Sequence, residues 1–138
     1  MAAFNKYQNG VEALVEGVNA GADSWKVALS NRTPVVATDI TLANAVEIAA
    51  GNGYTAGGNA AATVSSAQTG GTYKLVLTSP ATWTAAGGSI GPFQYAILYD
   101  STTNNLMGYW DYGTPVTLSV GESFSVVLDG TSGVFTVA

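Results

Sequence analysis

The chain has 138 residues and a formal net charge of −5, and only 9% of its residues are charged, against about 25% in a typical domain. Its length suits a single domain. The absence of cysteine and histidine excludes disulfides, thiol chemistry, and the commonest general base and transition-metal ligand. With four basic residues the chain lacks the positive surface that nucleic acids and anionic membranes attract, so we expect neither as a partner.

The low charge has two interpretations. Hydrophobic residues make up 47% of the chain, which excludes a disordered tail, and no apolar run approaches the ~20 residues of a membrane span. The first residues, MAAFNKYQNG, lack the apolar core of a secretory signal, so we expect the chain to stay where it is made. Few charges suit lasting contact with other proteins, because interface cores exclude charge. The alternative is a small acidic β-domain kept soluble by its net charge.

The clearest helical pattern spans residues 4–20. Apolar residues recur there at spacings of three and four, which places them on one stripe of a helix, and Gly21 is a suitable stop. The stripe either covers a sheet of the same domain or docks on a partner. It consists of Phe4, Tyr7, Val11, Leu14, Val15 and Val18.

After Gly21 the period changes to two, which predicts strands. Residues 24–30 alternate with Trp25, Val27 and Leu29 on one face, and the run FQYAILY at 93–99 predicts a strand buried on both faces. Shorter strand patterns lie at 63–68, 73–78, 82–84, 106–112, 115–118, 123–128 and 134–137.

Between these patterns, residues 31–62 are irregular and predict a long loop or arm, with at most a short helix at 42–48. We predict one domain over residues 1–138. Its fold class is mainly β, an antiparallel β-sandwich of jelly-roll or immunoglobulin-like type with one N-terminal α-helix. The loop region and the N-terminal segment are the candidate elements for clamping a partner.

Acidic residues are the main candidates for catalysis in a chain without histidine. Asp100 and Asp111 flank one predicted hairpin and Glu122 lies in a turn, and two carboxylates within ~10 Å would suit a glycosidase-type hydrolase. The alternative is that these residues belong to turns and keep the surface soluble. The oxygen-rich stretch 100–105 lacks the spacing of a calcium loop. We therefore expect no enzymatic activity, no cofactor and no metal.

Three aromatic residues suggest a second kind of site. Tyr109, Trp110 and Tyr112 resemble a sugar-stacking platform. Alternation along a strand sends Trp110 to the face opposite Tyr109, so core packing accounts for at least one of them.

Five segments carry a pattern that spans most of the chain. They are FNKYQNGVEALVEGVNAG, SWKVALSN, AVEIAAGNGYTAGG, TYKLVLTSPATWTAAGGSIGPFQYAILYD and GYWDYGTPVTLSVGESFSVVLDGTSGVFTVA. This pattern resembles small virion proteins of tailed bacteriophages that are encoded near the major capsid gene, some of which are capsid cement, or decoration, proteins. The resemblance rests above all on residues 47–58 and 88–99 and includes no catalytic signature.

The resemblance implies a non-enzymatic virion structural protein, in the first place a capsid decoration protein that binds the major capsid protein and stabilises the head. The implied location is the capsid surface, after synthesis in the bacterial host cytoplasm. Because capsid contacts fall on symmetry axes, we expect a dimer or trimer. The alternative is a tail or fibre component that binds a host-surface glycan. The predicted interface residues are Phe4, Tyr7 and Tyr54, and the alternative for Tyr54 is a loop tyrosine folded back on its own core.

Overall fold

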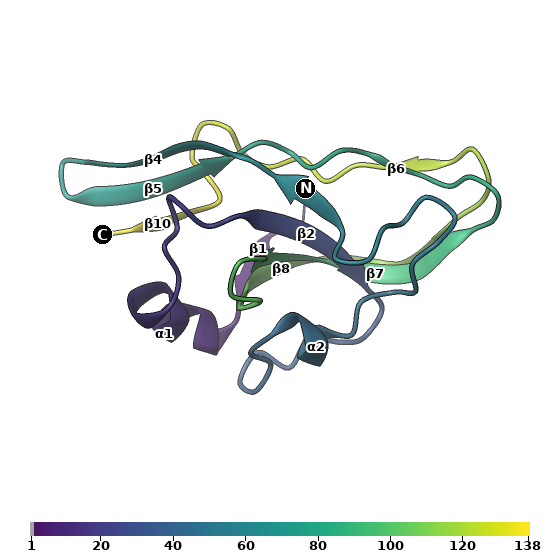
Figure 1. Ribbon diagram of the computed structural model, residues 1–138, viewed down its shortest axis with the longest axis horizontal. Helices are drawn as coiled ribbons and strands as arrows, with labels where there is room; N and C mark the ends of the chain where they lie inside the picture. Colours follow the sequence, from purple (N-terminus) through teal and green to yellow (C-terminus); the bar gives the residue numbers. More distant parts are fainter. Residues whose placement is uncertain (1) are drawn as a thin grey trace.

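The computed structural model describes residues 2–138 and is mainly β, with 45% strand, 9% helix and antiparallel sheets. Two layers of strands lie face to face, and two helices lie outside the first layer (Figure 1). This sandwich-like arrangement confirms the predicted mainly β, antiparallel architecture with a short N-terminal helix.

The first layer is one five-stranded sheet, and the second consists of a three-stranded sheet and a two-stranded ladder. The order in the first layer is β1 (Phe4–Lys6), β8 (Leu106–Leu118), β7 (Ile90–Asp100), β2 (Trp25–Ser30) and β3 (Asn59–Ala61). The second layer holds β10 (Phe135–Val137), β5 (Thr72–Leu77) and β4 (Thr63–Thr69), followed by β6 (Trp83–Thr84) and β9 (Ser123–Phe124). The helices are α1 (Gln8–Glu16) and α2 (Leu42–Ala45).

The main hydrophobic core lies between the two layers. Alternate residues of a strand share a face, so Trp25, Val27 and Leu29 of β2 all enter this core. Leu75 and Leu77 of β5 meet them from the second layer. The inward face of β2 is the one that the sequence alternation predicts.

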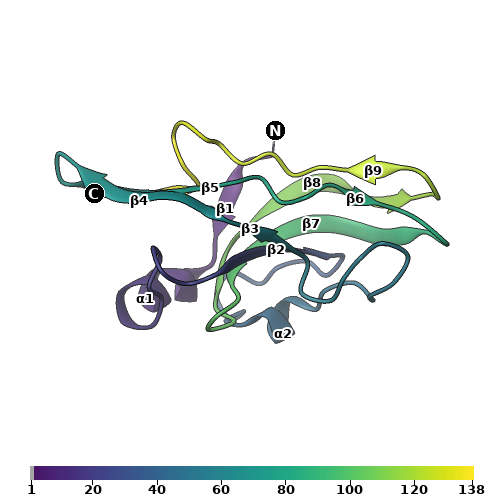
Figure 2. The same cartoon turned by 45° about the horizontal axis from the view of Figure 1, so that its top comes forward.

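The central strand β7 is buried on both faces, as its continuous apolar sequence predicts. Phe93 and Leu98 join the core between the layers, whereas Ile97 and Tyr99 belong to a second cluster on the outer face of the first sheet. The helices and the loop that follows β2 cover this outer face (Figures 1 and 2). The other buried members of the outer cluster are Tyr7, Ala28, Ala45, Tyr95 and Leu106.

The N-terminal helix occupies only the middle of the predicted range 4–20. The residues before it form β1, in which Phe4 pairs opposite Trp110 of β8. Gly10 lies where an added Cβ would come within 3.0 Å of the Leu106 carbonyl oxygen, so the missing side chain lets α1 pack closely on β8. The apolar spacing of this segment therefore comes from a strand, a helix and a turn in succession.

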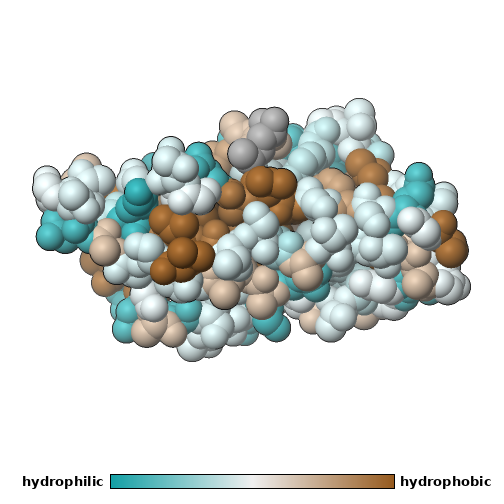
Figure 3. Space-filling model, turned by 90° about the horizontal axis from the view of Figure 1, so that it is seen from above, coloured by the Kyte–Doolittle hydropathy of each residue, from teal (hydrophilic) through white to brown (hydrophobic). Residues whose placement is uncertain are grey.

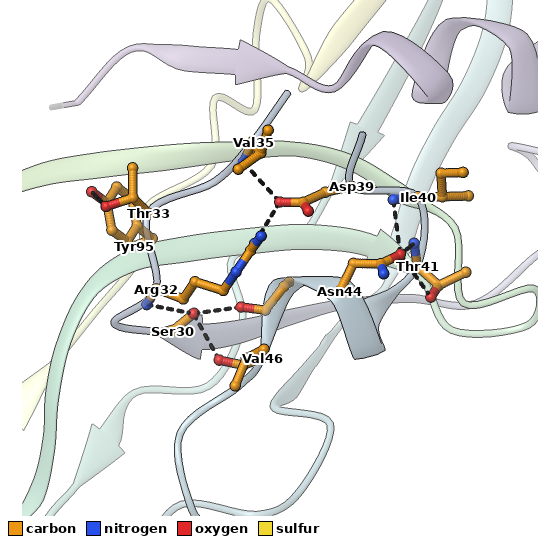
Figure 4. A network of polar contacts seen from close by, with 11 residues as sticks. Ser30, Arg32, Thr33, Val35, Asp39, Ile40, Thr41, Asn44, Val46 and Tyr95 are labelled. Carbon is orange, nitrogen blue, oxygen red and sulfur yellow. Dashed lines mark hydrogen bonds and ion pairs between the residues drawn. The ribbon is translucent and has the colours of Figure 1, made fainter. Parts of the chain in front are cut away.

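The predicted arm over residues 31–62 lies against the first sheet, and its last residues form β3. A polar network fixes its first half (Figure 4). The buried Asp39 carboxylate accepts hydrogen bonds from Arg32 Nη1 at 2.7 Å and from the Val35 amide at 2.8 Å. At the edge of the same network, the buried Ser30 hydroxyl lies 2.8 Å from the carbonyl oxygens of both Ala45 and Val46.

In contrast, the hairpin of β4 and β5 extends beyond the rest of the molecule (Figures 1 and 2). All seven residues of β4 are exposed. The hairpin turn is Gly70-Gly71, and both glycines have the positive φ that a two-residue hairpin turn requires. Full burial begins only at Leu75 of β5, whereas Tyr73, nearer the turn, is half-buried against the core.

Candidate partner-binding surface

Two of the three predicted interface residues are interior. Tyr54 is only 3% exposed, and its hydroxyl accepts a hydrogen bond from the Leu29 amide at 3.2 Å and donates one to Glu47 Oε2 at 2.7 Å. Burial is the main cause that raises the pKa of Tyr54. The structure thus corrects the expectation of a surface anchor. Tyr54 folds back on its own core, because its hydroxyl joins the loop to β2.

Tyr7 is completely buried at the start of α1. Its ring packs against Tyr109 with ring centroids 5.4 Å apart, and its amide donates to the Met107 carbonyl at 3.2 Å. Burial, and then the nearby Asp39 carboxylate, raise the pKa of Tyr7. Tyr7 therefore anchors α1 to β8 and offers no surface to a partner in this conformation.

Phe4 is the predicted interface residue that reaches the surface. Its half-buried ring packs on Trp110 with centroids 5.0 Å apart. The remaining part of the ring lines hollows on both sides of β1. Phe4 lies there because β1 is the last strand of the first sheet, so no further strand covers it on that side.

An apolar groove runs along this open side of the sandwich. Its volume is about 360 Å³, and it lies between α1, β1 and β10. Val11 and Val15, one helical turn apart on α1, form one wall and are 51% and 83% exposed. Phe135 and Val137 of β10 form the opposite wall together with Phe4.

The groove continues past Val15 toward the projecting hairpin. A second, shallower hollow shares Leu14, Val15 and Val137 with it and extends to Tyr73 of β5. Among the described residues, Lys6 is the only charged side chain that lines the first groove, so the side chains of this surface are nearly all uncharged. The helical spacing singled out Val11, Leu14 and Val15 in the sequence. No local pattern connects them with residues 135–137, since only the tertiary fold brings the two ends of the chain together.

The acidic residues that a hydrolase would need lie apart. Asp111 pairs opposite Tyr95, and Asp100 lies five residues further along β7, which corresponds to roughly 16 Å at the rise of a strand. Asp111 is exposed, and its hydrogen bond from Gln94 lowers its pKa. The exposed Glu122 accepts the Ser119 amide in its own turn. The proximity of Asp100 and Asp111 that the hairpin suggested is therefore wrong, because Asp100 lies beside the turn whereas Asp111 pairs with Tyr95, further along the ladder.

Asp100 is completely buried. Its Oδ1 accepts the Thr102 amide at 2.8 Å, and its Oδ2 has no hydrogen-bond partner among the described residues. Burial, and then the neighbouring Asp23, raise the pKa of Asp100. Within residues 2–138 no group of three or more acidic side chains is arranged to hold a metal ion.

The aromatic residues near this hairpin pack inward. Tyr109 contacts Tyr95 with ring centroids 6.0 Å apart on the outer face of the first sheet, whereas Trp110 belongs to the core between the layers. Tyr112 packs edge-on against Phe124 at 5.1 Å. The opposite orientation of Tyr109 and Trp110 follows the alternation predicted from the sequence, so the three rings do not share one face.

Comparisons with known proteins do not assign this surface a role. No family model, no curated protein and no solved structure matches the chain. Neither helix of the described chain has the length and apolar character needed to cross a membrane.

Proposed function

We propose that this protein is a non-enzymatic structural component of a bacteriophage virion, in the first place a capsid decoration protein that binds the major capsid protein and stabilises the head. The observation that carries the proposal is the nearly uncharged groove between α1, β1 and β10. The sequence resemblance to small virion proteins supplies the identity of the partner. The proposed location is the capsid surface, after synthesis in the bacterial host cytoplasm.

The groove suits a protein partner because its walls are exposed and apolar. An exposed valine on a helix leaves apolar surface in water at a cost of about 25 cal/mol per Å². Burial of Val11, Val15 and Val137 against a shell subunit would recover this cost, and because Lys6 is the one charged side chain among the described residues of the lining, few ions would be desolvated. The face above β4, β5 and β6 also carries brown apolar patches, set among neutral and hydrophilic residues (Figure 3).

The sandwich supplies the rigidity that a clamp on a shell needs. The groove walls belong to β1, β10 and α1, and each of these is attached to a longer strand in the body. A force applied at the groove is therefore passed directly to β8 and β5. Elements held by backbone ladders resist local opening better than free loops do.

Immunogold electron microscopy of intact virions, with an antibody against this protein, tests the location. We expect regular label over the head. Label restricted to the tail or fibres would overturn the capsid assignment and favour host recognition. Particles without any label would overturn the virion proposal as a whole.

Binding of purified protein to isolated head shells tests the groove. We expect Val15→Glu to weaken co-sedimentation with shells at least tenfold, because it places a charge in the apolar wall. The matched control is Val120→Glu, since Val120 is 65% exposed and lies outside the groove. Equal binding by both variants would contradict a role for the groove, and thermal melting checks that both variants are folded.

A further inference from the structure

The strand β4 has an edge with no hydrogen-bonding partner in this chain. It is the outermost strand of its sheet and pairs only with β5. Backbone hydrogen bonds outside that ladder involve none of residues 63–69 in the described chain. Free strand edges promote association because their N–H and C=O groups can pair with any approaching strand.

The direction of the free backbone groups follows from the turn. Thr69 and Thr72 flank the two-residue turn and form its closing hydrogen-bonded pair. Hydrogen-bonded and non-hydrogen-bonded pairs alternate along an antiparallel ladder, so Ala67 bonds to β5 whereas Ser66 and Gln68 direct their N–H and C=O groups outward. The register shift between Thr63 and Ser65 leaves residues 65–69 as the regular part of this edge.

Beyond the register shift at its start, residues 65–69 of β4 carry none of the usual protections of an edge strand. Natural edge strands are kept short, or carry lysine, proline or inward-pointing charges. The other edge strands of the two larger sheets, β1, β3 and β10, have three residues each, and β4 has seven. Its sequence TVSSAQT contains no charge and no proline. The nearest cation, Lys74 on β5, is engaged with the Thr131 carbonyl at 2.8 Å.

We infer that β4 is a self-association edge, at which two copies of the chain pair antiparallel about Ala67 and join their three-stranded sheets into one continuous sheet. In this register Ser66 of one copy exchanges backbone hydrogen bonds with Gln68 of the other. Ser65 then faces Thr69, and Ala67 faces its own counterpart. The facing side chains are uncharged, so they bring no like charges together.

A second copy is the occupant that this edge suits, because the regular part of β4 pairs with itself about Ala67 with its outward N–H and C=O groups matched. The strand is uncharged, so the pairing places none of the charges behind the net −5 of each copy directly opposite one another. The hairpin also extends beyond the body, so the two bodies remain apart when the edges meet (Figure 2). The inference specifies the contact of the dimer or trimer that the sequence analysis leads us to expect. It is tested with purified protein alone, so its failure is distinguishable from a failure of the virion proposal.

Sedimentation equilibrium gives the first test. We expect a concentration-dependent mass that rises from 14.0 kDa toward twice that value. Ala67→Lys places two lysines opposite each other at the symmetry axis and should weaken dimerisation at least tenfold, whereas Val120→Lys, with the same charge change at an exposed site far from β4 in sequence, should not. A wild type that stays monomeric at millimolar concentration, or equal effects of both variants, would overturn the inference.

Disulfide trapping tests the register, because the natural chain contains no cysteine. Ala67→Cys brings two thiols opposite each other in a non-hydrogen-bonded pair, with Cα atoms about 4.5 Å apart, within the range of a disulfide. Thr69→Cys is the matched control, since the two substituted positions are then roughly 13 Å apart along the strands. We expect fast covalent dimerisation of the first variant only. Equal rates, or faster cross-linking of the control, would contradict pairing about Ala67.

Discussion

Residues 31–58 and the hairpin of β4 and β5 are neighbours in the sequence and both contain several threonines and glycines, yet they are held in different ways. The first segment contains little regular structure but lies against the body throughout. The second has ideal strand pairing but projects from the body, with β4 fully exposed. Regular secondary structure and tertiary attachment are thus separate properties in this chain.

The difference between the two regions lies in a few buried polar contacts. Asp39, Glu47 and Tyr54 each join the loop segment to the body or to itself through hydrogen bonds of 2.7–3.2 Å. Tyr99 adds a further contact, since its hydroxyl donates to the Gly57 carbonyl at 2.7 Å, and burial raises its pKa to about 12. The outer half of the hairpin has no comparable buried group. A loop without repetitive structure can therefore be the better-fixed of two neighbouring segments.

The largest effect expected from this comparison concerns glycine. Gly58, at the end of the loop segment, has φ +78°, and an added Cβ would collide with the Val27 carbonyl oxygen. Gly58→Ala should lower the free energy of unfolding by about 2–5 kcal/mol, from the left-handed backbone and the clash together. Gly70→Ala, at φ +59° in the open hairpin turn, should cost only about 1 kcal/mol. Chemical denaturation measures both, and equal costs would show that the hairpin is as tightly constrained as the loop.

A smaller effect is expected for two tyrosine hydroxyls. Tyr54→Phe leaves the buried Leu29 amide without its acceptor and should cost about 1–3 kcal/mol. Tyr73→Phe removes an exposed bond to Ser66 Oγ and should change stability by less than ~0.5 kcal/mol. Thermal melting of both variants gives the comparison. A larger loss for Tyr73→Phe would mean that the hairpin, rather than the loop, depends on its hydroxyl contact.

Sequence periodicity is sufficient to predict which faces of the strands are buried, but not the order of the strands within a sheet. The alternation around Trp25 and the continuous apolar run at 93–99 predicted the inward faces of β2 and the burial of β7 correctly. The order β1-β8-β7-β2-β3 depends on pairings between distant segments, which no local pattern encodes. The range 4–20 was predicted as one helix because Phe4 keeps the helical spacing by chance, although it pairs in a strand with β8.

The candidate surface was predictable only in part. The exposed valines of α1 follow from the helical stripe, but their opposing wall comes from β10, more than a hundred residues away. Tyr54 illustrates the opposite error. A tyrosine flanked by glycines suggested an exposed anchor, and the signal for burial was Glu47, seven residues earlier, which accepts its hydroxyl. A pairing of this kind is visible only once the loop has folded.

The smallest expected effect is a gain in stability, whereas the preceding substitutions lower it. It tests whether a buried polar group must have a hydrogen-bond partner in order to stabilise its segment. Asp100 Oδ2 is buried without a hydrogen-bond donor and lies near Asp23. Asp100→Asn supplies a donor and removes a charge, so it should raise the free energy of unfolding at pH 7 by about 1 kcal/mol.

The pH dependence makes this prediction specific to the charge on Asp100. The pKa of Asp100 is raised above its ordinary value of 3.8 in the folded chain, so the folded state holds the proton more tightly than the unfolded state does. The contribution of Asp100 to stability is therefore greatest below that ordinary value and declines as the pH rises through the raised pKa. The advantage of Asp100→Asn should accordingly shrink as the pH is lowered from 7 to 3, as denaturant titrations at several pH values can measure. An advantage that stays constant over this range would mean that the pKa of Asp100 is the same in the folded and unfolded states, because the Thr102 amide offsets the effects of burial and of Asp23.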